Sequence, residues 1–308
     1  MSDAVAPGDA TAFPLTGKVA VVTGSGAGLG RAEALALASA GADVVLNDLP
    51  GRADEAAAEI RALGRRAVVV AGDVGERATA DALVAAAVDE LGSLDIVVNN
   101  AGFTRDRMIF NLSDEEFDDV LRVHLRGHFL LTRNAAAYWR GLSKESGAPV
   151  YGRIINTASE AFLSGSPGQA NYAAAKAGIM ALTLSAARGL ASSGVRANAI
   201  CPRARTAMTA QVFGEDTSGK SVDPYSPEHV APLVAYLASP AADGINGQCF
   251  VVYGGMVALL APPVVEQRFD ASGDAWDLAD LNRQIGGFFA ERDPALSFSA
   301  DSVMRLSI

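Results

Sequence analysis

Three side chains in the second half of the chain have the types and spacing needed for proton transfer. Tyr172 and Lys176 are four residues apart in an alanine-rich, strongly helical stretch, so both side chains project from one helix face. A tyrosine with an ordinary pKa of about 10 is a poor base at pH 7, and lowering that pKa to ~7 takes about 4 kcal/mol. A neighbouring ammonium has the right charge to do so. Ser159, thirteen residues upstream, can hold a substrate oxygen while Tyr172 moves the proton.

A glycine-rich turn near the start of the chain has the features of a phosphate-binding loop. It joins a β-branched run to a helical pattern, and its glycines follow the spacing Gly24-x3-Gly28-x-Gly30 rather than the strict G-x-G-x-x-G string. A tight turn and a close approach to pyrophosphate need residues without Cβ, and the helix start offers free N–H groups. A purely structural turn is the alternative. The expected dinucleotide contacts are Gly24, Ser25, Gly28, Leu29 and Gly30.

Two acidic residues follow the next two strands. Asp48 comes eighteen residues after Gly30, where a carboxylate binds the ribose 2′-hydroxyl in dinucleotide-binding folds; the alternative is a turn-forming Asp. The carboxylate would repel a 2′-phosphate, so the sequence predicts NAD rather than NADP. Asp73, followed by Val74, either places a polar group beside adenine or caps the next helix.

Short apolar runs alternate with helical segments from Lys18 onward. The runs are continuously apolar, as expected of strands buried on both faces. Segments rich in Ala, Leu and Glu, such as 31–39, 54–63 and 79–91, separate them. This alternation predicts an α/β fold with a single doubly wound parallel sheet of the Rossmann type. The expected strands are Val19–Thr23, Val44–Asn47, Ala67–Ala71, Ile96–Asn99, Ile154–Thr157, Ala197–Cys201 and Phe250–Tyr253.

The chain divides into three parts. Residues 1–16 are expected to form a flexible N-terminal arm, 17–255 a dinucleotide-binding catalytic domain, and 256–308 a C-terminal extension. The extension contains a helix-like stretch from Trp276 to Arg292 with apolar residues at helical spacing. We expect it to pack on the domain or on a neighbouring subunit. It is either a plain tail or a lid in which Trp276 and Phe288 wall the substrate cleft.

Composition argues against several classes of protein. A net charge of −10 argues against a nucleic-acid or anionic-membrane surface. Cys201 and Cys249 lie in apolar surroundings, as reduced, buried thiols of a cytoplasmic protein would, and no metal-ligand spacing is present. Residues 1–16 lack the pattern of a secretory signal, and the apolar run 256–265 is too short to span a membrane.

Taken together, these motifs resemble the short-chain dehydrogenase/reductases over residues 17–256. The shared residues are the glycine turn, Asn99-Asn100-Ala101-Gly102, Ser159 and Tyr172-x3-Lys176. The resemblance implies an NAD-dependent oxidoreductase that acts on CH–OH groups, with Ser159, Tyr172 and Lys176 as its catalytic residues. It also implies that Asn100, Ala101 and Gly102 shape the cofactor cleft, that Tyr172 and Lys176 contact the cofactor, and that Pro202 and Thr206 lie near the nicotinamide.

Two positions depart from the family pattern. His124 stands where the family has an asparagine that joins a proton relay to the lysine. Imidazole can also move protons, and a simply packed histidine is the alternative. Arg203 replaces the glycine of the family's Pro-Gly pair after the sixth strand, which removes a flexible point near the substrate loop.

A narrower resemblance concerns the substrate. Residues 203–209, 251–254 and 298–300 are similar to bacterial 3-hydroxyacyl-CoA dehydrogenases and 17β-hydroxysteroid dehydrogenases of steroid side-chain degradation. Residues 106–107 and 123–127 resemble the dehydrogenase part of peroxisomal multifunctional enzymes. The implied substrate is a 3-hydroxyacyl-CoA or a steroid hydroxyl. The rival functions are a 3-oxoacyl reductase of fatty-acid synthesis and a non-catalytic dinucleotide sensor.

The same resemblance implies a homodimer or homotetramer. Similar proteins pair through the helices expected at about 113–140 and 172–191. The second of these carries many small residues that allow helices to approach closely.

Overall fold

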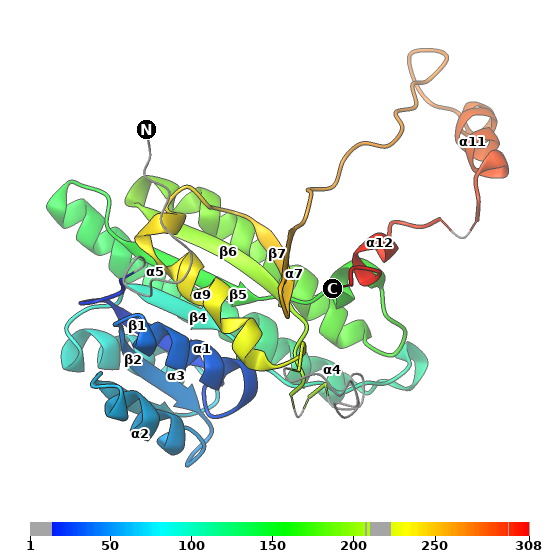
Figure 1. The fold of residues 1–308 in the computed structure, drawn as a ribbon. Coiled ribbons are helices and arrows are strands. Elements are labelled where there is room, and N and C mark those ends of the chain that lie inside the picture. The colour runs from blue at the N-terminus through cyan, green and yellow to red at the C-terminus, as the bar shows by residue number, and fades with distance from the viewer. Residues whose placement is uncertain (1–13, 207, 210–222, 295, 308) are drawn as a thin grey trace.

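A single eight-stranded sheet forms the centre of the molecule, and seven of its strands are those that the sequence predicts (Figure 1). The computed structural model describes residues 14–206, 208–209, 223–294 and 296–307, so residues 1–13 of the expected arm lie outside it. The strand order is β3-β2-β1-β4-β5-β6-β7-β8; β1 to β7 pair in parallel and β8 pairs antiparallel to β7. The strands are β1 Val19–Thr23, β2 Asp43–Asp48, β3 Ala67–Ala71, β4 Ile96–Asn99, β5 Gly152–Thr157, β6 Val195–Pro202, β7 Cys249–Tyr253 and β8 Met256–Leu259.

Helices cover both faces of the sheet (Figure 1). On one face α1 (Gly28–Ser39) packs between α2 (Asp54–Ala62) and α9 (Ala231–Ala238) over one buried apolar cluster. On the other face α3 (Arg77–Ala85) and α5 (Gly127–Ser146) pack over a second cluster, and α7 (Ala170–Gly189) packs against α4 (Asp114–Leu121). Burial on both faces is the reason why the strands read as continuous apolar runs. The doubly wound α/β fold is therefore confirmed.

The position of β1 between β2 and β4 in the sheet determines where a ligand can bind. Strand β1 pairs with β2 on one side and with β4 on the other, so the chain order reverses between β1 and β4. In such a sheet a crevice opens at the carboxyl ends of the strands at this switch point. The glycine turn follows β1, Asn100 follows β4, Ser159 follows β5 and Pro202 ends β6. All of these segments therefore meet at one edge.

Short helical turns complete the connections. A π-helical turn at Arg122–Arg126 joins α4 to α5 and contains His124. Such turns are frequent at functional sites. The remaining short elements are Ala86–Glu90, Ile109–Asn111, α6 Ala161–Ser164, Ala191–Ser193, Pro227–His229, Pro240–Ala242, α10 Leu278–Leu281, Asn282–Gly286, α11 Gly287–Glu291 and α12 Asp301–Met304.

Strand β8 is a feature that the sequence interpretation missed. It forms a hairpin with β7, in which Tyr253 pairs with Met256 across Gly254-Gly255. A two-residue Gly-Gly connection between β-branched runs is a hairpin signal, so the sequence did contain the information. The sheet consequently extends to Leu259, four residues past the boundary expected at 255.

The C-terminal extension leaves the domain and then returns to it (Figure 1). The expected helix is present between Leu278 and Glu291, but it stands apart from the sheet, with Leu278 85% exposed. Phe288 packs against Phe269 and Phe289 within the extension. Trp276 and Phe288 therefore do not lie beside Ser159, Tyr172 and Lys176 of their own chain. The part that returns to the domain is α12, which contacts α6.

Candidate active site

The glycine turn after β1 has no room for side chains. Gly24 (φ +64°) and Gly28 (φ +54°) have left-handed backbone conformations that cost other residues ~1–2 kcal/mol. A Cβ on Gly30 would lie 2.5 Å from Nδ2 of Asn100. Helix α1 begins at Gly28 after Ala27, which makes no side-chain cap, so the first-turn N–H groups can receive an anion. The turn thus fits the pyrophosphate of a dinucleotide.

Asp48, at the end of β2, faces the glycine turn. Its Oδ2 accepts a hydrogen bond from the N–H of Gly26 at 2.9 Å, and its Oδ1 accepts one from the N–H of Leu49 at 2.7 Å. The carboxylate lies where the fold places an adenosine ribose. Ser25, in contrast, is fully buried, and its hydroxyl donates to the carbonyl oxygen of Asn47 at 3.2 Å. The Ser25 side chain therefore stabilises the turn from inside.

Asp73, after β3, has a partner that the sequence did not indicate. Its Oδ2 accepts a hydrogen bond from Nη1 of Arg122 at 2.8 Å, and its Oδ1 accepts one from the N–H of Gly75 at 2.8 Å. Helix α3 begins four residues later and receives no side-chain cap. Val74 is nearly buried, and a Cβ on Gly127 would lie 2.9 Å from it. Asp73 thus joins the β3 end to the helix that carries His124.

The segments that follow β4 and β6 both contact the glycine turn. Oγ1 of Thr23 accepts hydrogen bonds from the N–H groups of Asn100 at 3.0 Å and Ala101 at 3.1 Å. After Pro202 ends β6, Thr206 lies beside Gly28, whose Cβ, if present, would be 3.2 Å from Cγ2 of Thr206. Asn100, Ala101 and Thr206, three of the predicted cofactor contacts, therefore lie at the glycine turn.

Ser159, Tyr172 and Lys176 meet beyond the carboxyl end of β5. The side chain of Ser159 lies near enough to the hydroxyl of Tyr172 to lower its pKa. Lys176 is fully buried, and its Nζ donates to the carbonyl oxygen of Thr157 at 2.5 Å. The same Nζ lies 5.4 Å from the centroid of the Tyr172 ring. The three side chains thus lie close to one another beyond the end of β5.

Burial dominates the pKa values of these groups. It raises the pKa of Tyr172 to about 12, against a smaller lowering by the hydrogen bond with Ser159. It lowers the pKa of Lys176 to about 7, while Cys201 and Glu33 act in the opposite direction. The lowered tyrosine pKa expected from the sequence is therefore absent from the cofactor-free protein. Burial lowers the pKa of Lys176 as well, so this amine is only partly charged at neutral pH, and desolvation of the phenol dominates the pKa of Tyr172.

His124 is buried directly behind the catalytic residues. Burial, assisted by the positive charge of Lys176, lowers the pKa of His124 to about 3, so the ring is neutral. Its Nε2 lies 2.7 Å from the carbonyl oxygen of Phe103 and 3.0 Å from the backbone nitrogen of Phe103, and we assign the ring proton to Nε2 because the contact with the carbonyl oxygen is the shorter one. Its Nδ1 is then an acceptor without a hydrogen-bond partner among the described residues. The His124 and Tyr172 rings meet edge to face, 5.3 Å apart.

Comparison with known proteins agrees with this geometry. The family model described as short chain dehydrogenase matches residues 18–217. The chain is a short-chain dehydrogenase. It is thus an oxidoreductase that acts on CH–OH groups with a nicotinamide dinucleotide, as the sequence motifs implied.

Individual relatives cover most of this dehydrogenase. Hydroxyacyl-CoA dehydrogenase ChsB1 of Mycobacterium tuberculosis is 60% identical over 94% of both chains. The peroxisomal multifunctional enzyme type 2 of Mus musculus is 41% identical over 79% of this chain, which spans 32% of that longer protein. A crystal structure of a short chain dehydrogenase from Mycobacterium avium superimposes with a TM-score of 0.81 at 42% identity, covering 93% of this chain and 99% of that one.

The dehydrogenase contains site residues that the sequence interpretation missed. Asn171 is fully buried, and its Nδ2 donates to the carbonyl oxygens of Arg105 and Glu116, which fixes the start of α7 and hence Tyr172. Its position directly before Tyr172 in the sequence is the signal that could have identified Asn171. Glu33, on α1, is completely buried and has no hydrogen-bond partner for either carboxylate oxygen within the described part of the chain. Nothing in the sequence indicated that this helical glutamate is buried without a hydrogen-bond partner.

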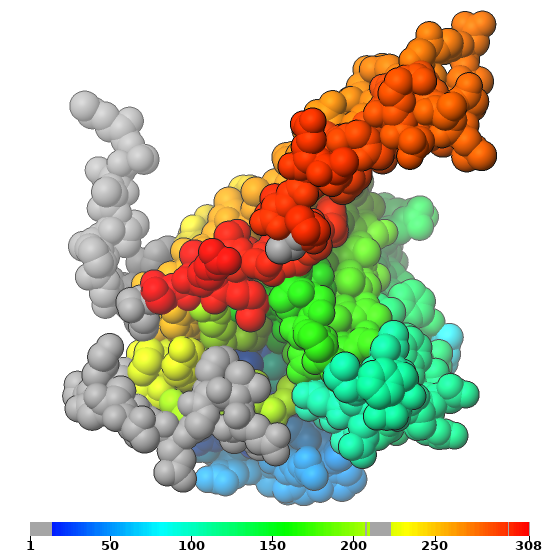
Figure 2. Space-filling model, turned by 90° about the vertical axis from the view of Figure 1, so that its right-hand side faces the viewer, coloured from blue at the N-terminus to red at the C-terminus, as the bar shows by residue number. Residues whose placement is uncertain are grey.

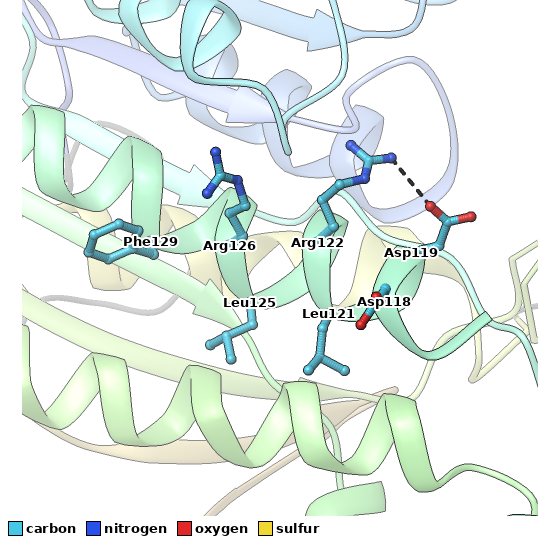
Figure 3. A pocket seen from close by; sticks show the side chains of 7 residues that line it. All are labelled: Asp118, Asp119, Leu121, Arg122, Leu125, Arg126 and Phe129. Atoms are coloured by element: carbon cyan, nitrogen blue, oxygen red, sulfur yellow. Dashed lines mark ion pairs between the residues drawn. The ribbon is translucent and has the colours of Figure 1, made fainter. Parts of the chain in front are cut away.

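A shallow depression of about 480 Å³ lies outside the catalytic centre of the dehydrogenase (Figure 3). Leu121 and Leu125 project from the α4–α5 helix toward α7, whereas Arg122 and Arg126 point to the opposite side. Leu125 packs on Gly178, where a Cβ would lie 2.9 Å away. The depression therefore belongs to the outer helical face and not to the site at the strand ends.

No helix among the described residues is long and apolar enough to cross a membrane. They include no group of three or more His, Cys, Asp or Glu side chains arranged to hold a metal ion.

Proposed function

We propose that this protein is an NAD-dependent 3-hydroxyacyl-CoA dehydrogenase, in which Tyr172 is the acid–base residue. The observation that carries the proposal is the grouping of three side chains: Ser159 acts on the hydroxyl of Tyr172, and the Nζ of the buried Lys176 lies 5.4 Å from the centroid of the Tyr172 ring. The similarity to a hydroxyacyl-CoA dehydrogenase over nearly the whole chain supports the substrate class.

Each catalytic side chain has a distinct task in this proposal. When bound, the nicotinamide supplies the acceptor for the hydride that leaves the carbinol carbon. Ser159 donates a hydrogen bond to the substrate oxygen and holds it next to Tyr172. Ionised Tyr172 takes the hydroxyl proton as the C–O bond becomes a carbonyl. Because burial raises the pKa of Tyr172 to about 12, oxidation requires nearby positive charge, and Lys176 is placed to provide part of it.

His124 has the properties of a proton-transfer group in this site. The unpartnered Nδ1 of the neutral ring can accept a hydrogen bond from the Lys176 ammonium or from a water between them. Phe103 holds the other ring nitrogen, and Gly102 leaves the space for the ring, since a Cβ there would lie 2.6 Å from Nδ1. We therefore assign His124 the place that an asparagine has in the family.

Preference for NAD follows from the position of Asp48. Its carboxylate, bonded to the glycine turn, can accept hydrogen bonds from the ribose hydroxyls and would repel a 2′-phosphate. The nearby Arg31 forms a salt bridge with Glu59, in which Nη2 of Arg31 lies 2.5 Å from Oε2 of Glu59, so its charge is already paired. The remaining proposed cofactor contacts are Gly24, Ser25, Gly28, Leu29, Gly30, Asp73, Val74, Asn100, Ala101, Gly102, Tyr172, Lys176, Pro202 and Thr206.

We also propose a homo-oligomer that pairs through α4–α5 and α7. Ala174, Ala177 and Ala181 form an exposed stripe of small residues on α7, while Ala175 and Gly178 pack inside the chain. Sedimentation at micromolar concentration should give a dimer or tetramer, and a monomer would contradict the proposal. The buried, free thiols of Cys201 and Cys249 are consistent with the proposed cytoplasmic location.

A substrate panel with purified protein tests the function. We expect NAD⁺-dependent oxidation of 3-hydroxyacyl-CoA esters, and the panel compares steroid-side-chain hydroxyacyl-CoA, medium-chain hydroxyacyl-CoA and free steroid alcohols. Tyr172→Phe should reduce turnover by ~10²-fold or more and leave NADH binding nearly unchanged, because only the proton carrier is lost. A variant that keeps more than about a tenth of the rate would show that Tyr172 is not the acid–base group.

Efficient reduction of 3-oxoacyl thioesters with NADPH, without NAD⁺-dependent oxidation, would instead favour the reductase function. A 3-oxoacyl-[acyl-carrier-protein] reductase from Synechocystis is 39% identical over 79% of this chain. Binding of NADH without turnover of any substrate would favour a dinucleotide sensor.

A further inference from the structure

Arg203 holds the catalytic serine turn through a buried ion pair. It follows Pro202 at the end of β6, and its Nε and Nη2 each donate to a carboxylate oxygen of Glu160 at 2.7 Å. The Arg203 and Glu160 side chains are only 12% and 8% exposed. Glu160 immediately follows Ser159, whose Oγ accepts a hydrogen bond from the N–H of Ala161 at 3.2 Å. This bidentate salt bridge between Arg203 and Glu160 therefore fixes the turn that carries Ser159.

The same guanidinium also holds the C-terminal end of the described chain. Its Nη2 donates to the carbonyl oxygen of Val303 at 2.7 Å, and its Nη1 donates to that of Leu306 at 2.5 Å. Its Cζ lies 4.9 Å from the ring centroid of Tyr253, whose hydroxyl donates to Leu306 as well at 3.1 Å. We call Arg203, Glu160, Tyr253 and the carbonyls of Val303 and Leu306 the Arg203 clamp.

Aromatic stacking extends the Arg203 clamp to the segment that follows β6. The ring of Tyr253 stacks on that of Tyr225 at 5.6 Å with an interplanar angle of 8°. Arg205 lies over the outer face of Tyr225, and its Nε is 2.9 Å from a carboxylate oxygen of Asp223. Residues 203–205, at the end of β6, are therefore tied to residues 223–225.

The held C-terminal segment lies against the element that follows Ser159. The N–H of Ala300 donates to the carbonyl oxygen of Leu163 in α6 at 2.9 Å, and α12 contacts α6. Val303 packs on the buried cluster that contains Ala158. In Figure 2 the red C-terminal residues lie across the green surface of the chain, while the orange part of the extension projects away from it.

We propose that Arg203 is a positioning residue that sets the orientation of Ser159 through Glu160 and holds residues 300–306 as a wall of the substrate site. A glycine at this position has no side chain to make these bonds, so this dehydrogenase uses Arg203 to make its C-terminal segment part of substrate selection. The inference rests on the proposed function, because it takes Ser159 as the group that holds the substrate oxygen.

The first test distinguishes a loss of Ser159 positioning from a general loss of protein stability. Glu160→Gln and Arg203→Met should each lower kcat at least tenfold for both 3-hydroxybutyryl-CoA and a ring-bearing 3-hydroxyacyl-CoA, because small misplacements of reacting groups cost up to ~10²-fold. NADH affinity should stay within about twofold. The matched control is Arg196→Met, which removes an arginine–Asp243 pair from the opposite end of β6 and should leave both kcat values unchanged. If Arg203→Met behaves like the control, the positioning role is refuted; if it does not fold, Glu160→Gln decides the question.

The second test concerns the wall. A chain that ends at Ser299 keeps the pair between Arg203 and Glu160 but lacks residues 300–308. We expect its KM for the ring-bearing substrate to rise at least tenfold, with kcat and KM for 3-hydroxybutyryl-CoA nearly unchanged. Equal effects on both substrates, or none, would refute the wall. Failure of the proposed function is recognised separately, because the wild type itself would then not oxidise either 3-hydroxyacyl-CoA with NAD⁺.

Discussion

Glu33 offers a direct test of how burial controls charge in this protein. Both carboxylate oxygens lack partners within the described residues, the residue is fully buried, and desolvation raises its pKa from 4.5 to about 8. The positive charge of Lys176 only partly opposes this. We predict that Glu33→Gln stabilises the cofactor-free protein at pH 8 and has little effect at pH 5.

The sign and the size of the effect follow from the two pKa values. Below pH 4.5 the carboxyl is protonated in the folded and unfolded states, so it costs nothing. Between pH 4.5 and about 8 only the unfolded chain ionises, and the free energy of unfolding falls as the pH rises. At about 1.4 kcal/mol per pH unit, the full loss by pH 8 is about 5 kcal/mol. Local relaxation reduces this, so we expect a gain of about 2–4 kcal/mol from the neutral amide.

Urea unfolding of both proteins at pH 5 and pH 8, at equal protein concentration, measures this difference. The matched control is Glu55→Gln on the exposed side of α2, which should not change the pH dependence. Lys176, whose pKa of about 7 is raised by Glu33, also titrates in this range, so the difference reports Glu33 together with its interaction with Lys176. If wild type and Glu33→Gln lose stability in parallel between pH 5 and pH 8, Glu33 is not a desolvated, partnerless carboxyl.

The remaining predictions concern the cofactor and the proton path. Wild-type kcat/KM should favour NAD over NADP at least tenfold, or about 1.4 kcal/mol, and Asp48→Ala should narrow that gap; equal use of both cofactors by the wild type would contradict the role of Asp48. Gly102→Ala should displace the His124 ring, because the added Cβ would lie 2.6 Å from Nδ1, and should lower both Tm and kcat; unchanged values would show that the ring is free to move. His124→Asn should keep kcat within several-fold while His124→Leu lowers it at least tenfold, and equal rates for the two would exclude a proton-transfer role.

The sequence by itself determined the sheet and the chemistry of its edge. All seven expected strands are present with ends within two residues of the expected ones, because strands buried on both faces must be continuously apolar. The glycine turn and the Tyr172–Lys176 pair could be predicted from the sequence because each depends on local backbone geometry. Absence of a Cβ and a four-residue helical spacing are properties of neighbouring residues in the chain.

Only the tertiary structure decided what distant residues do for one another. Asp73 meets Arg122 across 49 residues, and Arg203 joins Glu160 to carbonyl groups about 100 residues further along the chain. The raised pKa of Tyr172 and the isolation of Glu33 likewise depend on burial created by the whole fold. Local sequence specifies backbone conformation, whereas desolvation and long-range pairing arise when elements pack. For that reason the sequence showed the residue types at the site but not their electrostatics or the Arg203 clamp.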